Sequence, residues 1–414
     1  MGNIHLARGH RSVSGRAVSR VLALTAAGTL LAACGSTGGG KSSGAAGGSG
    51  SSANTAPIKV GALQSITGAL ATYGIAEQHA TQAAIDQINK SGGVNGRQLK
   101  LTFYDPAGDT ATAVTLTRRL IDQEKVDIVV GGGTSSGIAL AMKPLLQAAG
   151  IYFISTEAAD AIVTPASSSP LTFATTLGSG TVVQSMFDYL KKKGIAKVGI
   201  LGDSTAYGQS GVTAAKAAAK NAGIELVTGT YDPASTDLTA DINKLTSAGA
   251  KAWINWTSGA SGVLFMKNAA TLGLADKGPV MASFTYSNPA LMQQAGTASK
   301  GVTVAGVKAT VLADLPSSDP QKAGLQTMAD ALKSKYNEKA TIYASQTWDA
   351  VNIAAASIKQ AGNTTAKDVA KANEGLTYVG TQGTYKYTAE DHRGLGASVP
   401  IIMTWDGSKF AVQN

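Results

Sequence analysis

The chain has few of the side chains that most metal centres and covalent enzymes use. Its 414 residues include one cysteine, Cys34, and four histidines, and only 6% are aromatic. A single cysteine cannot form an intramolecular disulfide, and its position argues against thiol catalysis in the folded domain. The histidines that follow Cys34, His79 and His392, are far apart and have no metal-ligand spacing. We therefore predict no metal and no cofactor, and a domain stabilised by burial.

Charge gives little support for a nucleic-acid partner. The formal net charge is +9, and it falls to +5 without the first 33 residues, which carry four arginines and no acidic residue. The remaining lysines are scattered, apart from Lys191–Lys193 at the end of a predicted helix, where cations suit the helix dipole. We interpret this as an ordinary solvated surface and expect no nucleic-acid binding.

The first 34 residues predict the protein's location. Four arginines precede an apolar run over 21–33, which is too short to span a bilayer and has the composition of an export signal. The run ends in Leu31-Ala32-Ala33-Cys34, which resembles the lipobox where bacterial lipoproteins are cleaved and acylated. We predict a lipoprotein signal peptide over 1–33, lipidation (palmitate) at Cys34, and anchoring in the cell membrane at its extracytoplasmic face.

An alternative is that the apolar run is a buried helix and Cys34 a core residue. The segment 34–56 argues against it, because it is mostly Gly, Ser and Ala and is typical of a flexible tether. No globular element has begun before the cysteine. We therefore assign 34–56 as a Gly/Ser-rich tether.

From Pro57 onward, short β-rich runs alternate with longer amphipathic segments, which is typical of parallel α/β folds. Strands are predicted over 58–63, 99–104, 126–130, 151–155 and 171–176, with helices over 76–90 and 137–149. The pattern then restarts, with strands over 197–201, 224–230, 251–256 and 279–284 and helices over 181–193, 208–222, 238–248 and 263–272. We predict two doubly wound (Rossmann-like) parallel-sheet lobes.

Two later helices, 323–336 and 343–361, have no strand between them and suggest a return to the first lobe. We predict lobe one over 57–175 plus 308–392, and lobe two over 176–307 plus 393–414. In such sheets ligands bind beyond the carboxyl ends of the strands, beside helix N-termini. Two facing edges would form a cleft that closes on its ligand.

Several predicted cleft loops imitate enzyme motifs. Gly132–Gly137 has the glycine spacing of a phosphate loop, but Ile138 and Ala139 replace the Lys and Ser/Thr that it needs. The same loop fits G-x-S-x-G, and Gly202-Asp203-Ser204 is close to the nucleophile block of another esterase family. A secreted serine esterase using Ser135 or Ser204 with His392 is therefore an alternative. Helix capping together with ligand binding explains the loop hydroxyls better, because the only histidines after the signal segment are His79 and His392.

Further segments carry a family resemblance. They are Ile58–Gly61, Thr67-Gly68, Tyr73-Gly74, Ala84–Asn89, Gly92–Arg97, Asp105-Pro106, the serine loop after Val130, Asp203–Gly208, Gly380–Gly383 and Tyr385–Arg393. In their order and spacing they resemble the branched-chain amino-acid (Leu/Ile/Val-binding-like) solute-binding lipoproteins of ABC transporters, with the periplasmic binding protein type I fold. The resemblance implies two lobes joined by three crossover strands, a solute receptor rather than an enzyme, permease subunits as partners, and a monomer. A sensory receptor of the same fold is a further alternative.

The resemblance also implies a ligand site. In the family the serine loop and the loop after the fourth strand bind the ligand's carboxylate and amino groups, and a lobe-two aromatic residue faces them. With the other predicted cleft positions, the candidates are Thr67, Tyr73, Thr134, Ser135, Ser136, Ser155, Thr156, Glu157, Tyr207, Trp256, Ser258 and Phe284. Trp256 and Phe284 could instead pack the core of lobe two.

Two departures from the family affect the ligand. Where members of the family have a hydroxyl residue, this chain has Ala159. Where they have the acidic residue that pairs with the ligand's ammonium, it has Phe284. A desolvated ammonium needs a compensating charge, and Glu157 is the nearby candidate. We expect a small polar or aromatic solute, namely an amino acid, an amide or an organic acid.

Overall fold

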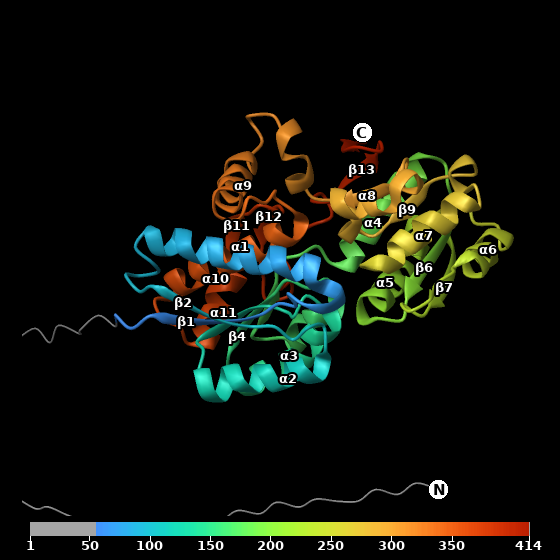
Figure 1. Cartoon of the computed structure of the whole chain (residues 1–414). Helices are drawn as coiled ribbons and strands as arrows, with labels where there is room; N and C mark the ends of the chain where they lie inside the picture. Colours follow the sequence, from blue (N-terminus) through green and yellow to red (C-terminus); the bar gives the residue numbers. More distant parts are fainter. Residues whose placement is uncertain (1–54, 414) are drawn as a thin grey trace, which may run out of the picture. The chain divides into compact units, whose positions relative to one another are not determined.

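The computed structural model describes residues 55–413. The predicted signal peptide, the lipidation site Cys34 and the tether up to residue 54 lie outside the described residues. Within the described part, no helix is both long and apolar enough to cross a membrane. The α/β fold is built on two mainly parallel β-sheets. Each sheet is covered by helices (Figure 1).

The first sheet has the strand order β2-β1-β3-β4-β5, and every neighbouring pair is parallel. A parallel sheet covered on both faces needs strands that are apolar throughout, which is why these short runs are rich in Val, Ile and Phe. The strands are β1 (Ile58–Leu63), β2 (Leu99–Tyr104), β3 (Ile128–Gly131), β4 (Tyr152–Ser155) and β5 (Thr172–Ala174).

Alternate residues of this sheet join two different cores. Val130 and Ile154 belong to the core on the side of helices α1 (Ala71–Lys90) and α10 (Ile342–Ala361). Val129 and Phe153 belong to the core on the side of α2 (Thr110–Arg119) and α3 (Ser136–Ala148). Helix α10 therefore packs against α1, although the two are far apart in sequence (Figure 1). We call this sheet with its helices lobe one.

The rest of lobe one comes from the later part of the chain. Helix α9 (Lys322–Tyr336) packs on α1, and α11 (Ala366–Glu374) packs on α10. A two-stranded ribbon, β11 (Thr377–Val379) with β12 (Thr384–Lys386), follows. Helices from this later part of the chain therefore pack with the helices of the first sheet.

The second sheet, in lobe two, has the order β14-β13-β10-β9-β8-β6-β7. Strands β6 to β10 are parallel to one another. At one edge, β13 pairs antiparallel with β10, and β14 pairs antiparallel with β13. The strands are β6 (Lys197–Asp203), β7 (Glu225–Tyr231), β8 (Ala252–Trp256), β9 (Val280–Ala282), β10 (Thr303–Gly306), β13 (Ile401–Trp405) and β14 (Phe410–Val412).

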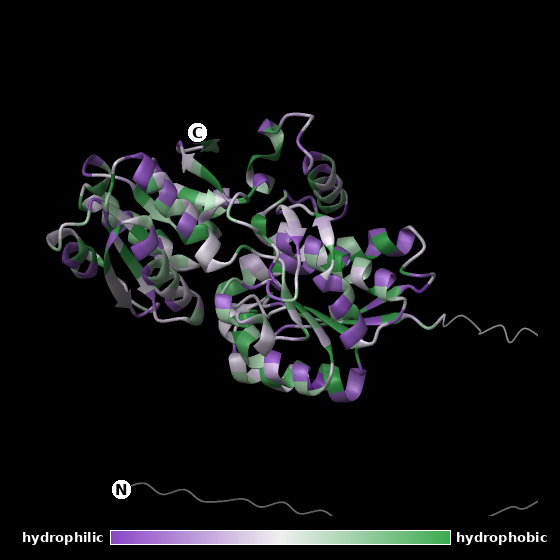
Figure 2. Ribbon diagram, turned by 180° about the vertical axis from the view of Figure 1, so that it is seen from behind, coloured by the Kyte–Doolittle hydropathy of each residue, from purple (hydrophilic) through white to green (hydrophobic). Residues whose placement is uncertain are grey.

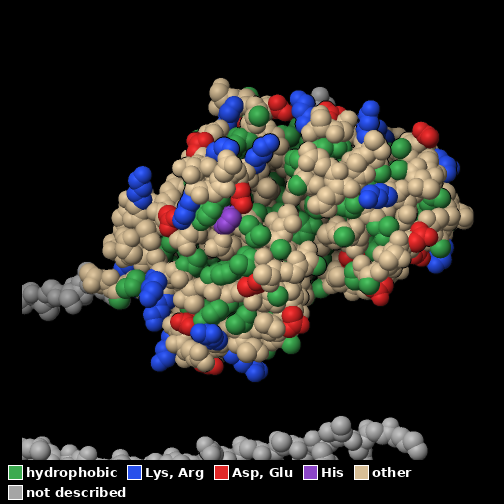
Figure 3. All heavy atoms as spheres, viewed as in Figure 1, with side chains coloured by type: hydrophobic (Ala, Val, Ile, Leu, Met, Phe, Trp, Pro, Cys, Tyr) green, Lys and Arg blue, Asp and Glu red, His purple; other side chains and the backbone are tan. Residues whose placement is uncertain are grey.

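Five helices surround this second sheet. They are α4 (Ser179–Lys192), α5 (Ala206–Ala222), α6 (Thr239–Ser247), α7 (Ala260–Thr271) and α8 (Pro289–Ala295). The apolar colour of Figure 2 gathers on the strands and on the helix faces turned toward them. Figure 3 shows basic and acidic side chains scattered over the visible face rather than gathered in one patch.

The chain passes between the lobes three times: after β5, after β10, and between β12 and β13. The exact lobe boundaries given above stay a prediction. Two elements differ from expectation. The strand predicted to reach Phe284 ends at Ala282, and Phe284–Tyr286 form a single 3₁₀ turn. Helices α8 and α11 and strands β10 to β14 were not predicted.

Candidate functional site

Both sheets reverse their strand order, between β1 and β3 in lobe one and between β6 and β8 in lobe two. At such a point the loops after neighbouring strands diverge and leave room for a ligand. Here they enclose a cavity of about 380 Å³. It is lined by Leu70, Tyr73, Gly108, Thr110, Thr134, Ser135, Ser136, Gly137, Thr156, Glu157, Ala158, Thr176, Thr205, Ala206, Tyr207, Ser258, Phe284, Thr285, Tyr343 and Gln346.

The serine loop (131–137) forms one wall of the cavity at the start of α3. Thr134 has a left-handed backbone with φ of 62°. Its hydroxyl accepts a hydrogen bond from the Ser65 amide at 3.0 Å and donates one to Glu77 Oε2 at 2.7 Å. Ser135 is the N-cap of α3, yet its side chain makes no capping hydrogen bond. The first-turn amides of α3 therefore lack a side-chain partner at the edge of the cavity, where they suit an anionic or carbonyl group.

Two carboxyl groups lie at this wall. Glu77, on α1, is fully buried, and Gln346 Nε2 donates to its Oε1 at 3.0 Å. Glu157, in the loop after β4, lines the cavity and is only 8% exposed; the Thr156 hydroxyl donates to its Oε1 at 3.2 Å. Gly132 makes room for it, because a Cβ there would lie 2.5 Å from Glu157 Cγ. Lys, Arg and His are absent from the residues that line the cavity.

Burial changes the protonation of both carboxyl groups. It raises the pKa of Glu77 to about 7, although hydrogen bonds from Thr134, Gln346 and Thr156 oppose the shift. Burial, together with the neighbouring charge of Glu77, raises the pKa of Glu157 well above its ordinary value. Ionising two buried acids without a neighbouring cation has a large unfavourable free energy. The pair therefore holds at least one proton near neutral pH.

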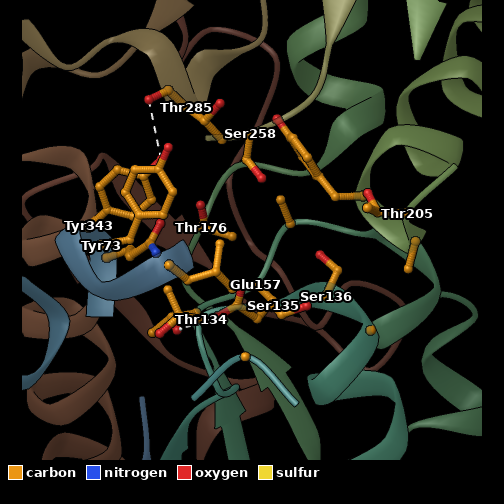
Figure 4. Close-up of a pocket in the computed structure, with 18 of the residues that line it drawn as sticks. Tyr73, Thr134, Ser135, Ser136, Glu157, Thr176, Thr205, Ser258, Thr285 and Tyr343 are labelled. Atoms are coloured by element: carbon orange, nitrogen blue, oxygen red, sulfur yellow. Dashed lines mark hydrogen bonds between the residues drawn. The ribbon is translucent and has the colours of Figure 1, made fainter. Parts of the chain in front are cut away.

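Arg393 fixes the backbone of the Glu157 loop without neutralising its carboxyl group. Its guanidinium donates to the carbonyl oxygens of Thr176 at 2.8 Å, Ala159 at 3.2 Å and Glu157 at 3.4 Å. These partners are backbone atoms. The Glu157 side chain therefore stays available to the cavity, and Figure 4 shows it between Thr134 and Thr176.

Lobe two supplies an aromatic wall. The Tyr207 ring lies edge-on to Phe284, with 6.0 Å between centroids, and tilted to Trp256 at 5.7 Å. Thr205 caps α5 by accepting a hydrogen bond from the Gly208 amide at 3.1 Å. Among the lining groups, the hydroxyls of Tyr207 and Thr176 are buried and have no hydrogen-bond partner. Buried hydroxyls normally have a partner, so these two are free to meet a ligand.

Two tyrosines of lobe one reach across to the backbone of lobe two. The rings of Tyr73 and Tyr343 stack with centroids 4.4 Å apart (Figure 4). The Gly259 amide donates to Tyr73 Oη at 2.7 Å, and the Tyr343 hydroxyl donates to the Thr285 carbonyl at 3.3 Å. These contacts hold the lobes together in this structure. The glycine at 259 is required, since its φ of 71° and ψ of −147° are almost exclusive to glycine.

We expect Tyr73→Phe and Tyr343→Phe to favour separation of the lobes. Each loses one hydrogen bond worth about 1 kcal/mol, which changes the equilibrium between closed and open states about fivefold. Small-angle X-ray scattering of the free protein should show a larger radius of gyration. Tyr336→Phe is the matched control, because Tyr336 stacks on His79 instead of contacting lobe two. Scattering equal to that of the control would mean that the two hydroxyls do not hold the lobes closed.

Most of the predicted binding residues line the cavity, although their contact with a ligand stays a prediction. Three do not line it. Thr67 is exposed and donates to Asp105 at 2.7 Å, and Ser155 is buried and accepts from the Glu157 amide at 3.1 Å. Trp256 packs behind Tyr207, as the core alternative predicted, while Phe284 does line the cavity. The lining members are Tyr73, Thr134, Ser135, Ser136, Thr156, Glu157, Tyr207, Ser258 and Phe284.

The sequence analysis missed Glu77, Thr176, Thr205, Thr285, Tyr343 and Gln346. Glu77 had a usable signal, because it lies four residues after Tyr73 and three before Ala80, on the buried stripe of α1. Tyr343 and Gln346 had no local signal, since their position depends on α10 packing against α1.

The comparisons with known proteins agree with this architecture. Residues 57–408 match the model of a family described as periplasmic binding proteins. The chain belongs to this family. It is 28% identical over 363 residues to a Leu/Ile/Val-binding protein homologue of Brucella melitensis, covering 87% of this chain and 94% of that protein.

Solved structures share the fold. An extracellular ligand-binding receptor of Rhodopseudomonas palustris has a TM-score of 0.79 and 21% identity over 86% of this chain and 99% of that one. A branched-chain amino-acid transporter substrate-binding protein of Streptococcus pneumoniae, solved with isoleucine, has a TM-score of 0.73 and 23% identity over 86% and 99% of the two chains. The predicted type I periplasmic binding fold is confirmed. The family match makes the chain an extracytoplasmic solute-binding protein.

The esterase alternative is wrong, because the family binds solutes. The geometry gives the physical reason. His392 is 2% exposed, stacks on Phe173 with centroids 4.1 Å apart, and hydrogen-bonds through Nδ1 to the carbonyls of Ser169 and Thr172, each at 3.0 Å. No hydrogen bond connects it to Ser135 or Ser204. Its Nε2 lies 3.8 Å from Glu374 Oε1.

Proposed function

We propose that this protein is the lipid-anchored receptor of an ABC importer and delivers a small solute to the permease subunits when its lobes close. The observation that carries the proposal is a cavity lined by residues of both lobes. Tyr73 and Tyr343 of lobe one make hydrogen bonds across it to the backbone of lobe two. A ligand that contacts both walls stabilises the closed state by its differential affinity. A sensory receptor of the same fold would use the same cavity.

The cavity supports an amino acid or a related amine as the solute. Its volume of about 380 Å³ is in the range of small-molecule sites. The uncapped start of α3 suits a carboxylate or a carbonyl, and Glu157 suits an ammonium. The aromatic wall suits an apolar or planar side chain. An organic acid without an amine has less support, because two buried carboxyl groups would lie near it with no cation among the lining residues.

A thermal-shift screen of the full chain in detergent tests the receptor. The panel holds amino acids, amides, aromatic acids and polyamines. A bound solute should raise the melting temperature by linkage, by an amount that grows with its concentration. Tyr207→Ala should abolish the shift, whereas Tyr189→Ala, on α4 and outside the cavity lining, should keep it. No shift with any compound would count against a receptor. Co-purification with a permease or with a signalling protein would separate importer from sensor.

Lipid anchoring has its own test. We expect the mature chain to begin at Cys34 with a mass that includes a diacylglycerol group, and to partition into detergent. Cys34→Ala should leave the precursor uncleaved. A mature protein that retains Met1, with no added lipid mass, would contradict the anchor while leaving the solute-binding proposal intact.

A further inference from the structure

We propose that Glu77 and Glu157 form one acid pair that recognises a protonated amine of the solute, and that binding of this amine releases one proton to solvent. The inference rests on the proposed function and deepens it by naming the charged group that the cavity selects. It assigns the recognition of the ammonium to lobe one, because the corresponding loop of lobe two, Ser283–Tyr286, contains no carboxylate.

The two carboxyl groups are linked through Thr156, whose side chain is a hydrogen-bond partner of both, and the charge of Glu77 acts on Glu157. Glu77 accepts from Thr134 at 2.7 Å and from Gln346 at 3.0 Å, and these donors also line the cavity. Glu157 accepts from Thr156 at 3.2 Å. These partners are all uncharged. The hydrogen bonds orient the carboxyl groups, but they cannot replace a counter-charge when both groups ionise.

The other titratable groups around the pair do not supply a positive charge to it. Tyr73 on α1, Tyr343 on α10 and Tyr207 on α5 line the same cavity, and burial raises the pKa of each hydroxyl. Arg393 is the nearby cation, and its guanidinium donates to backbone carbonyls. Asp160, which follows the Glu157 loop, is a further acid whose charge acts on Arg393. The positive charge missing from this cluster can therefore come from the ligand.

Two unpartnered hydroxyls point independently to a ligand at this place. Thr176 is fully buried and Tyr207 is 8% exposed, and both line the cavity without a hydrogen-bond partner. Thr176 lies beside Glu157 in Figure 4. An occupant with polar groups would satisfy these hydroxyls and the carboxyl group of Glu157 together. The acid pair therefore belongs to a cavity that offers a ligand further hydrogen-bonding groups, and it is not an isolated cluster of acids.

The proton balance follows from the burial. In the free protein the pair keeps at least one proton, because burial and mutual repulsion oppose a second negative charge. The ligand arrives as R–NH₃⁺ and keeps its proton. Its charge favours the carboxylate form of Glu157, so the carboxylic acid loses H⁺ to solvent and an ammonium–carboxylate pair forms. No covalent bond changes other than this O–H bond.

Proton release makes affinity depend on pH. Linkage requires the association constant to rise about tenfold per pH unit for each proton released, as long as the amine stays protonated. Since burial raises the pKa of Glu157 well above its ordinary value in the free protein, the rise should occur below that raised pKa and level off where Glu157 is ionised even without ligand. A ligand without an amine should not show this slope.

The test uses matched probes that differ at the amine. L-isoleucine is compared with 3-methylpentanoate, L-phenylalanine with 3-phenylpropanoate, and putrescine with 1,4-butanediol. Titration calorimetry in buffers of different ionisation enthalpy counts the protons released. We expect at least one amine to bind with release of about one proton and its amine-free partner to bind about 10- to 100-fold more weakly, the order expected for losing a hydrogen bond to a charged group.

Variants at the two acids complete the test. Glu157→Gln should lower the affinity for the amine at least 30-fold and abolish the proton release and the pH slope. Glu77→Gln should reduce the proton release while folding normally, since an amide can still accept from Thr134. Glu338→Gln, which removes a surface carboxylate bonded to His79, is the control and should keep both properties.

The outcomes separate this inference from the proposed function. An amine-free partner that binds as tightly as its amine, or amine binding without proton release, would overturn the inference. The inference would also be overturned if none of the six probes bound while another compound of the wider panel did. In each of these cases the proposed receptor function would remain supported. A failure of every compound would instead count against the receptor itself.

Discussion

Asp349→Ala should lower the free energy of unfolding by about 3–5 kcal/mol, the range for removing a buried charged acceptor and leaving its donors unpaired. Asp349 lies on α10 and is fully buried. Its carboxylate accepts from the backbone amides of Thr381 at 2.8 Å and Gln382 at 3.0 Å, and from the Thr381 and Tyr385 hydroxyls, each at 2.9 Å. The residue therefore fastens the loop between β11 and β12 to α10.

The loss should come mainly from the two amides. The Thr381 hydroxyl also donates to the Ser345 carbonyl at 3.0 Å, and the Tyr385 hydroxyl to the Thr175 carbonyl at 2.6 Å, so each keeps a partner in the variant. The amides of Thr381 and Gln382 have no such second acceptor among the bonds of this loop. Two buried N–H groups without partners cost about 1–3 kcal/mol each.

Chemical denaturation at pH 8 measures the effect, where the aspartate is ionised because burial raises its pKa only to about 6. Asp349→Asn keeps one acceptor oxygen and should lose roughly half as much. Asp330→Ala, on the exposed face of α9, should stay within about 0.5 kcal/mol of the wild type. A loss no larger than that of Asp330→Ala would show that the Gln321 amide, which donates to the Gly380 and Thr381 carbonyls, holds the loop alone.

The free protein should lose stability as the pH rises from about 4.5 to about 7, and Glu77→Gln should remove up to about 3 kcal/mol of this loss. Burial raises the pKa of Glu77 from its ordinary 4.5 to about 7. Between these values the folded protein keeps a proton that the unfolded chain gives up. Stability from this group is therefore complete below about pH 4.5 and is lost as the pH rises through about 7.

Denaturation of both proteins at several pH values measures the difference. Wild type and Glu77→Gln should have similar stability near pH 4.5, and the variant should be the more stable one at pH 8. Glu225→Gln removes an exposed carboxylate paired with Lys197, and surface pairs contribute little, so it should follow the wild-type curve. If Glu77→Gln follows that curve as well, Glu77 ionises without penalty and a cation must neutralise it in the free protein.

Much of the fold was predictable because its signals are local. The runs 58–63 and 99–104 coincide with β1 and β2, since each is a short, mainly apolar run bounded by turn residues. The hairpin of β13 and β14 was missed although Asp406-Gly407 lies between its two strands, which is a recognised turn signal. That signal is weak beside a chain terminus, where the flanking runs are short.

The site was only partly predictable, because half of it depends on contacts between distant segments. Glu157 lies two residues after the end of β4, so its place at the cavity follows from the strand order. Glu77 reads locally as one polar residue on the stripe of a helix, and only the packing of α10 against α1 brings Gln346 to it. The acid pair is therefore a tertiary feature, and no spacing along the chain reveals it.

The late position of α10 in the chain also bears on the order in which the protein can be assembled. Strand β1 lies between β2 and β3 in the sheet of lobe one and is made early. Helix α10, which covers α1 and the same core, comes more than 250 residues later. During synthesis from the N-terminus, β6 to β10 can pair before lobe one is complete. A chain that stops before Ile342 would expose the apolar face of α1 and the first sheet. The last quarter of the sequence thus completes both lobes, because α10 closes one core and β13–β14 extend the other sheet.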